Sequence, residues 1–309
     1  MSAIALTQIL LNGLALGAAY ALIALGFVIV LNAAGAVNFA QGELVMAGGF
    51  AAIALAPLIG EATALPGLFL LPLVMALMGL IGAGFAWIAY FPVHKRHQVA
   101  VFVSTIAAGL VLQHLANALF GAAPRAGPPL IAGDSLTIGA LSISLQQIAV
   151  MICAAVLISG TGLFLGRTQT GRHMRAVAQD PEMAAAIGIR SKRMITLSFA
   201  LAIALAGAAG LLLSNQFFVS PNDGGLFMLK AYIAVTIGGW GRLDGAVIGA
   251  LLIGIFETLV AAFASYLVAE ALLYALLLIM RTPGWLWASA PERWRSMPCS
   301  SQVITRCMC

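Results

Sequence analysis

The chain has 309 residues, of which 62% are hydrophobic and only 8% charged, and its formal net charge is +5. Soluble domains carry about 25% charged residues, so this chain cannot cover a water-exposed surface and lipid must solvate most of it. Its basic residues lie between long apolar runs, as in a membrane topology signal, and are not spread over a folded surface as nucleic-acid binding would require.

Apolar runs long enough to cross a bilayer follow one another along the chain. A transmembrane helix needs about 20 residues of this kind. The candidate spans are 9–31, 44–60, 66–92, 99–120, 141–165, 194–219, 229–241, 245–268 and 270–288. The run 229–241 is the shortest and ends in GGWG, so it is either a crossing or a broken, re-entrant segment. The sequence therefore predicts an all-α, polytopic transmembrane helix bundle with about eight or nine spans.

The loops predict the orientation of this bundle. The loop 167–193 holds six basic residues against two acidic ones, and basic loops stay on the cytoplasmic side. The pair Lys95 and Arg96 lies two spans earlier and is placed on the same side, which puts the N-terminus outside. We expect residues 1–290 to form one transmembrane domain and residues 291–309 a disordered cytoplasmic tail.

Glycines recur at the spacing of closely packed membrane helices. Gly13 and Gly17 form one GxxxG motif, and Gly245 and Gly249 form another. Small residues at this spacing let two helix backbones approach each other in lipid. Tight packing is the plain interpretation, and helices that rock against one another during function are the alternative.

The stretch 37–43 reads VNFAQGE and interrupts an apolar region with three polar side chains, those of Asn38, Gln41 and Glu43. A carboxylate at membrane depth is costly unless it is paired or hydrated. Either Glu43 lies at a membrane boundary, or the three side chains hold a bent helix junction that lines a polar path.

Further polar residues fall inside predicted spans, and three of them are candidates for a functional role. Gln113 and Asn117 are four residues apart and share one face of a helix, and Glu257 is the only carboxylate within 245–268. These side chains could line a hydrophilic path or act as hydrogen-bonding contacts between helices.

The loop 167–193 contains the signature of a short helix. Asp180 can cap its first amides, Pro181 suits its first turn, and Glu182 favours the positive end of its dipole. Residues 183–187 (MAAAI) then supply an apolar turn that Gly188 closes. This helix could dock in a groove of a partner protein or lie on the lipid surface between its basic flanks.

Several catalytic and binding motifs are missing. The sequence has no Walker A motif for ATP, no HExxH motif, and no GxSxG motif with a plausible partner. Its four cysteines have no histidines at metal-ligand spacing. We therefore expect neither enzymatic activity nor a metal site.

Four stretches together resemble one family. The runs 13–26 (GLALGAAYALIALG), 37–43 (VNFAQGE), 171–189 (GRHMRAVAQDPEMAAAIGI) and 238–249 (GGWGRLDGAVIG) are similar to the permease subunits of branched-chain amino acid ABC transporters. The H-type permeases of the Liv system are the most similar subgroup, and the resemblance covers roughly residues 8–285.

The resemblance implies a multi-pass permease in the bacterial inner membrane. Its partners would be a second, M-type permease subunit, two ATP-binding subunits and a periplasmic substrate-binding protein. No cofactor is expected on this chain, because ATP and magnesium would be used by the partner subunits. Among the polar side chains described above, we expect Asn38, Gln41, Glu43, Gln113, Asn117 and Glu257 to line the translocation path.

The resemblance also assigns a coupling role to the helix that begins at Asp180. Permeases of this kind contact their ATPase through a loop with the pattern EAA-xxx-G. Glu182, Ala184 and Gly188 occupy its first, third and seventh positions, while Met183 departs from the second. The ATPase-coupling helix would comprise Asp180, Pro181, Glu182, Met183, Ala184, Ala185 and Gly188.

The C-terminal end of the chain departs from the family pattern. Family members tend to end a span with Arg-Pro-x-Gly-Leu-Phe-Gly, whereas residues 281–287 read RTPGWLW.

The alternative function is a stand-alone, ion-coupled secondary transporter that would use Glu43 or Glu257 as its proton or sodium site.

Overall fold

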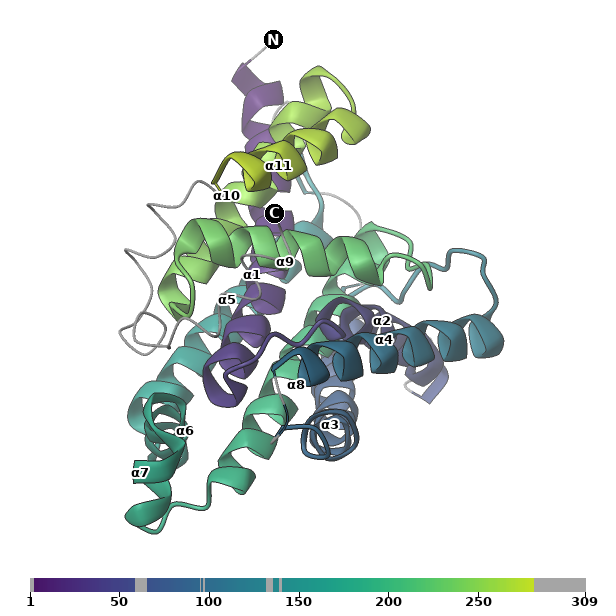
Figure 1. Ribbon diagram of the computed structural model, residues 1–309. Coiled ribbons are helices and arrows are strands. Elements are labelled where there is room, and N and C mark those ends of the chain that lie inside the picture. The colour runs from purple at the N-terminus through teal and green to yellow at the C-terminus, as the bar shows by residue number, and fades with distance from the viewer. Residues whose placement is uncertain are drawn as a thin grey trace.

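The computed structural model describes residues 3–58, 66–94, 96, 98–131, 136–138 and 141–280. These residues are almost all helical (Figure 1). The exception is a small antiparallel hairpin of strands β1 (Leu136–Ile138) and β2 (Leu141–Ile143), in which Leu136 lies opposite Ile143. The predicted tail 291–309, its three cysteines, the RTPGWLW stretch and Lys95 lie outside the described residues.

Six described helices are long and apolar enough to cross a bilayer. They are α1 (Ala3–Ala34), α3 (Pro66–Phe85) with its π-helical continuation (Ala86–Tyr90), α4 (Gln98–Phe120), α5 (Leu145–Arg167), α8 (Ser191–Gln216) and α10 (Leu243–Phe263). Three apolar helices are shorter, namely α2 (Gln41–Leu55, followed by the 3-10 turn Ala56–Leu58), α9 (Gly224–Gly238) and α11 (Tyr266–Met280). The helical bundle is confirmed, and the count of eight or nine crossings stays a prediction.

The shortest predicted run is a regular helix. The run 229–241 belongs to α9, which starts five residues earlier, at Gly224, and is not broken within its 15 residues. Gly239 ends it with a φ of 96°, a conformation that favours glycine. The earlier start was missed because the polar sequence around Asp223 resembles a loop.

Helix α1 forms the centre of the bundle. In its apolar window 94% of the residues are buried, against 22% in that of α4. Every residue from Ala15 to Leu31 is buried, as expected of a helix that is apolar all round. Helices α5, α8, α9 and α10 pack around it, and α8 also packs against α2 and α3.

The predicted glycine motifs lie where helices touch. A side chain at Gly254 of α10 would collide with the backbone of Gly17 in α1. A side chain at Gly245 would collide with Gly238 of α9. Tight packing is therefore confirmed for both GxxxG motifs, because there is no room for a methyl group at these contacts.

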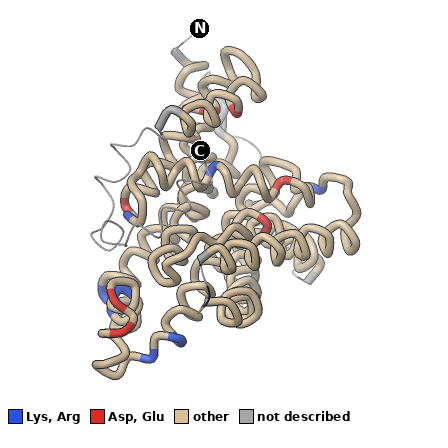
Figure 2. The backbone as a smooth tube through the Cα atoms, viewed as in Figure 1, with Lys and Arg blue, Asp and Glu red and all other residues tan. Residues whose placement is uncertain are grey.

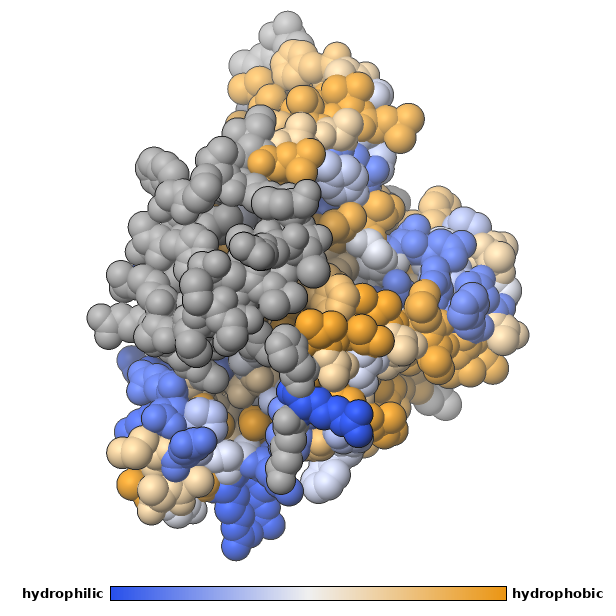
Figure 3. All heavy atoms as spheres, viewed as in Figure 1, coloured by the Kyte–Doolittle hydropathy of each residue, from blue (hydrophilic) through white to orange (hydrophobic). Residues whose placement is uncertain are grey.

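The outer surface is apolar over long stretches (Figure 3). Leu80, Ile88 and Val111 are 73%, 79% and 66% exposed, which suits contact with lipid chains. Charged residues gather instead at the end of the molecule formed by the loop 167–193 (Figure 2).

The glycine contact between α1 and α10 predicts a matched pair of variants. Gly254→Ala should destabilise the protein by about 1–3 kcal/mol, because the methyl group overpacks the contact. Gly160→Ala on α5 should be neutral or slightly stabilising, because nothing lies within 4 Å of the added atom. Thermal unfolding in the same detergent measures both, and equal losses would contradict the assigned contact.

Candidate functional site

The loop 167–193 folds into two short helices, α6 (Gln169–Gln179) and α7 (Pro181–Ala186). The Asp180 carboxylate caps α7, since its Oδ1 accepts hydrogen bonds from the amides of Glu182 (2.9 Å) and Met183 (3.0 Å). Pro181 occupies the first turn, where a missing N–H costs no hydrogen bond. The predicted helix start is confirmed in each of these details.

The end of α7 is also fixed by local bonds. Gly188 has a φ of 86°, and its amide donates to the Ala185 carbonyl at 3.0 Å. The Ile189 amide donates to the Ala184 carbonyl at 3.0 Å, and the Ser191 hydroxyl donates to the Pro181 carbonyl at 3.0 Å. These bonds hold α7 in a set direction relative to the start of α8.

Helix α7 exposes apolar side chains among charged ones. Met183 and Ile187 are 65% and 74% exposed, while Ala184 alone in α7 is buried. Figure 2 shows this helix at one end of the molecule, beside the basic residues of α6 and of the start of α8. Such a patch suits contact with another surface, because exposed Met and Ile side chains in water contribute nothing to this chain's own stability.

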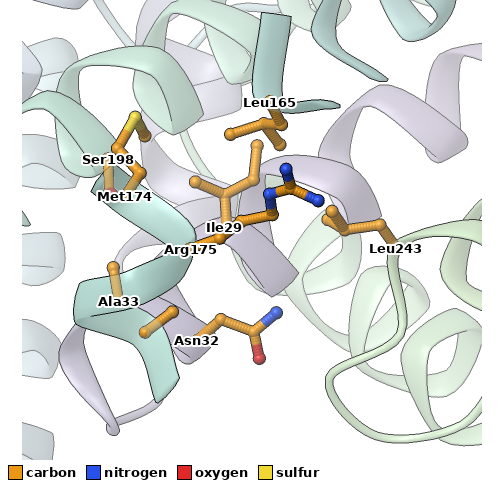
Figure 4. Close-up of a pocket in the computed structure, with 9 residues that line it drawn as sticks. Ile29, Asn32, Ala33, Leu165, Met174, Arg175, Ser198 and Leu243 are labelled. Atoms are coloured by element: carbon orange, nitrogen blue, oxygen red, sulfur yellow. The ribbon is translucent and has the colours of Figure 1, made fainter. Parts of the chain in front are cut away.

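Helix α6 joins this patch to the bundle. Its residues Met174 and Val177 are buried, and Gly171 packs against the backbone of Leu165. A small, partly open pocket of about 50 Å³ lies between α6 and parts of α1, α5, α8 and α10 (Figure 4). Its lining includes Arg175, which donates to the Gly166 carbonyl, and Asn32, which donates to the Gly241 carbonyl. The seam between α6 and the bundle is therefore not completely filled.

The residues of the VNFAQGE stretch form a turn that starts α2. Asn38 Oδ1 accepts a hydrogen bond from the Ala40 amide at 3.1 Å, and Asn38 Nδ2 donates to Gln41 Oε1 at 3.5 Å. Gln41 is completely buried against Gly26 of α1, and its Nε2 has no hydrogen-bond partner. Because Gly26 lies well inside α1, α2 begins beside the interior of a long helix and not beside its end.

Glu43 lies where α2, α4 and α9 meet. Its carboxylate lies directly against Gly224, the first residue of α9, and its Cγ lies against Gly109 of α4. Its Oε2 atom is buried and has no hydrogen-bond partner. A buried polar atom without a hydrogen bond destabilises the folded state, so this junction is a candidate binding site for a ligand.

The two amides of α4 extend the same junction. Gln113 lies one helical turn after Gly109, and its Nε2 donates to Asn222 Oδ1 at 3.1 Å, just before α9 begins. Asn117 Nδ2 donates to the Gln113 carbonyl in its own helix at 3.2 Å. Asn38, Gln41, Glu43 and Gln113 are thus brought together, whereas the Asn117 side chain bonds locally.

Glu257 lies apart from this junction and has a partner that the sequence analysis missed. Lys230 of α9 forms an ion pair with it, with 2.7 Å between Nζ and Oε1. The side chains of both residues are 3% exposed. The available signal was that Lys230 is the single charged residue within the apolar run of α9.

These features define a polytopic helical membrane protein with a polar junction inside the bundle and a capped, exposed helix at one end. Residues 9–281 match the family model described as "Branched-chain amino acid transport system / permease component". The chain therefore belongs to this family of transport permeases, and the predictions of a multi-pass inner-membrane permease and of the family resemblance are confirmed.

Named relatives agree with the family. The chain is 33% identical over 263 residues to the high-affinity branched-chain amino acid transport system permease protein BraD of Pseudomonas aeruginosa, covering 81% of this chain and 84% of BraD. It is 34% identical over 295 residues to LivH of Salmonella typhimurium, covering 89% and 94% of the two chains. A more distant relative is the autoinducer 2 import system permease protein LsrD of Escherichia coli, 28% identical over 68% of this chain and 64% of LsrD.

Adjacent glycines at the start of α9 allow a test of the junction. Gly224→Ala should displace the Glu43 carboxylate and lower substrate uptake several-fold, because the added methyl group collides with it. Gly225→Ala should leave uptake unchanged, because nothing lies within 4 Å of that position. Uptake is measured in cells and normalised to the amount of protein in the membrane. Normal uptake by both variants would remove Glu43 from the path.

Proposed function

We propose that this chain is one permease subunit of an ATP-driven importer for branched-chain amino acids. Membership of the permease family supports the class, and the similarity to BraD and LivH, which are branched-chain amino acid transport permeases, supports the substrate. The observation that carries the proposal is α7, a capped helix with exposed Met183 and Ile187 at the charged end of the molecule.

The partners follow from this function. A second, M-type permease would complete the translocation path, and two ATP-binding subunits would dock on the coupling helix formed by Asp180, Pro181, Glu182, Met183, Ala184, Ala185 and Gly188. A periplasmic binding protein would deliver the substrate. ATP and magnesium would bind to the ATPase subunits, so this chain would need no cofactor and would catalyse no reaction.

The geometry suggests how motion would enter the bundle. Closure of the ATPase would push α7, whose position relative to α8 is fixed by the bond from Ser191 to Pro181. Helix α8 packs against α1, α2 and α3, so its displacement would reach the start of α2 at Gln41 and Glu43. The cavity between α6 and the bundle leaves space for such a shift. Differential affinity of the ATPase for two states of the bundle would supply the driving free energy.

The three short helices bear on the number of crossings. Helices α2 and α9 would cover part of the bilayer each and meet at Glu43, since their first residues touch there. With α11, they would bring the six long spans to the predicted eight or nine. Asn38, Gln41, Glu43 and Gln113 would line the path at this meeting point.

Reconstitution separates the proposal from its alternative. The chain, its partner permease, the ATP-binding subunits and the binding protein are placed in vesicles, and uptake of radiolabelled leucine is measured. We expect uptake only with ATP, because this chain has no nucleotide motif and no energy source of its own. Uptake by this chain alone under a proton or sodium gradient would instead establish the stand-alone secondary transporter.

The coupling helix predicts a second result. Gly188→Trp should abolish ATP-driven uptake and weaken co-purification with the ATPase while leaving membrane insertion intact, because the bulky side chain obstructs the docking surface. Gly121→Trp is a matched control, because Gly121 also has a positive φ (78°) and open space around it. Both variants incur similar backbone strain, about 1–2 kcal/mol. If the Gly188 variant transports and co-purifies normally, α7 is not the docking site.

A further inference from the structure

A second cluster of polar side chains lies inside the bundle, away from Glu43. Lys230 is at its centre, and it draws side chains from α1, α9, α10 and α11. Its members are Tyr20, Lys230, Glu257, Tyr266, Glu270 and Tyr274. Polar and charged groups inside an apolar bundle are normally hydrogen-bonded or paired with an opposite charge.

The donors of Lys230 are all in use. An ammonium group has three N–H donors. Lys230 Nζ donates to Glu257 Oε1 at 2.7 Å, to the Tyr266 hydroxyl at 2.9 Å and to the Tyr20 hydroxyl at 3.0 Å. Lys230 Nζ also lies 5.2 Å from the ring centre of Tyr20 and 5.1 Å from that of Tyr266, within the range of cation–π attraction. The cluster therefore already contains one fully satisfied ammonium site.

Three polar atoms of the cluster have no hydrogen-bond partner. Glu270 Oε1 lies 3.8 Å from Lys230 Nζ, which is an ion-pair distance without a hydrogen bond. Glu270 Oε1, Glu257 Oε2 and the Tyr274 hydroxyl are buried and have no hydrogen-bond partner. Glu257 itself is only 2% exposed. Two carboxylate oxygens thus lack a donor, and the Tyr274 hydroxyl, which can both donate and accept, lacks any hydrogen-bond partner.

The formal charges of the cluster do not balance either. Two carboxylates, those of Glu257 and Glu270, share one ammonium group. Among the described residues no other cation forms an ion pair with either carboxylate. An excess negative charge in a low-dielectric interior is strongly unfavourable. A group with one positive charge and hydrogen-bond donors would balance both the charge and the unpaired oxygen atoms.

We infer that Glu257, Glu270 and Tyr274 form a binding site for a primary ammonium group, the α-ammonium of the transported amino acid. A primary ammonium supplies one positive charge and three donors, which matches the charge, the two free carboxylate oxygens and the Tyr274 hydroxyl, whose oxygen can also accept a hydrogen bond. A metal ion is a poorer match, because the described residues contain no group of three or more His, Cys, Asp or Glu side chains suited to one. The identity of the ligand as an amino acid rests on the proposed function.

The site lies near the surface on its α11 side. Tyr266 is 49% exposed and the Glu270 side chain 14%, while the three free oxygen atoms are covered. Helix α11 packs against α10 and α9, so a shift of its side chains would uncover the oxygens without unpacking α1.

The binding test uses the full chain in lipid nanodiscs, without partner proteins. Radiolabelled L-leucine is bound and then displaced either by isoamylamine, which keeps the ammonium and lacks the carboxylate, or by 4-methylpentanoate, which lacks the ammonium. We expect isoamylamine to displace leucine and 4-methylpentanoate to fail. Ammonium chloride is a third probe, and we expect it to compete weakly, whereas sodium chloride should not compete.

Variants locate the site. Glu270→Gln and Tyr274→Phe should each weaken leucine and isoamylamine binding about tenfold or more, the effect of losing a charge-assisted hydrogen bond. Glu270→Gln keeps the 2.7 Å pair between Lys230 and Glu257 and removes only the longer 3.8 Å ion pair, and Tyr274→Phe removes a hydroxyl with no hydrogen-bond partner, so the unfolding temperature should change little. Asp244→Asn is the control, because it removes a carboxylate from an exposed position on α10.

The results separate this site from the proposed function. Undetectable leucine binding in the wild type, equal binding by all variants, or competition by sodium would overturn the ammonium site. ATP-driven uptake that survives in both variants would also overturn it, while leaving the importer intact. Conversely, amine-specific binding in a chain that transports without an ATPase would preserve the site and overturn the proposed function.

Discussion

Close backbone contact is the constraint on which this bundle depends. Lipid chains are as apolar as leucine, so burial of apolar side chains does little to bring helices together inside a membrane. Packing must come from short distances between backbones, and glycine makes them possible. Gly17 against Gly254, and Gly238 against Gly245, bring α1, α9 and α10 into contact at points where no larger residue fits. Helix α1 can be enclosed on all sides because its neighbours approach it so closely.

The few charged residues are divided between two environments. The largest group, six basic and two acidic residues, lies in the loop 167–193, where water can solvate it, and this loop carries the exposed helix α7. The charged residues inside the bundle lie close to α9, and they are Glu43, Lys230, Glu257 and Glu270. The first residue of α9 touches Glu43, and Lys230, about two turns further on, pairs with Glu257. Helix α9 therefore links the polar junction at α2 and α4 to the ionic cluster at α10 and α11.

Local rules predicted some of these features and could not predict others. The cap by Asp180, the first-turn Pro181 and the left-handed Gly188 follow from neighbouring residues, so the sequence was sufficient for α7. The pair between Lys230 and Glu257 joins residues 27 positions apart on different helices, and only the packing of α9 on α10 brings them together. The helical runs were likewise predictable from apolar length, whereas their ends shifted where glycine and polar residues mark both loops and helix starts.

The contact of Gln41 with Gly26 shows the same limit. The sequence marked Asn38, Gln41 and Glu43 as unusual, but their position beside the interior of α1 depends on how the chain turns back after Ala34. Likewise, the proximity of Glu43 to Gln113 requires α2 and α4 to pack side by side, which no spacing within either helix indicates.

The short connection between α7 and α8 has a mechanical consequence. Only residues 187–190 separate it from α8, and their conformation is held by backbone hydrogen bonds and by the Ser191 hydroxyl on Pro181. A connection this short and this well bonded behaves as a stiff joint and not as a tether. A force applied at α7 would therefore rotate α8 about its own axis as well as translate it, and the helices packed against α8 would be displaced with it.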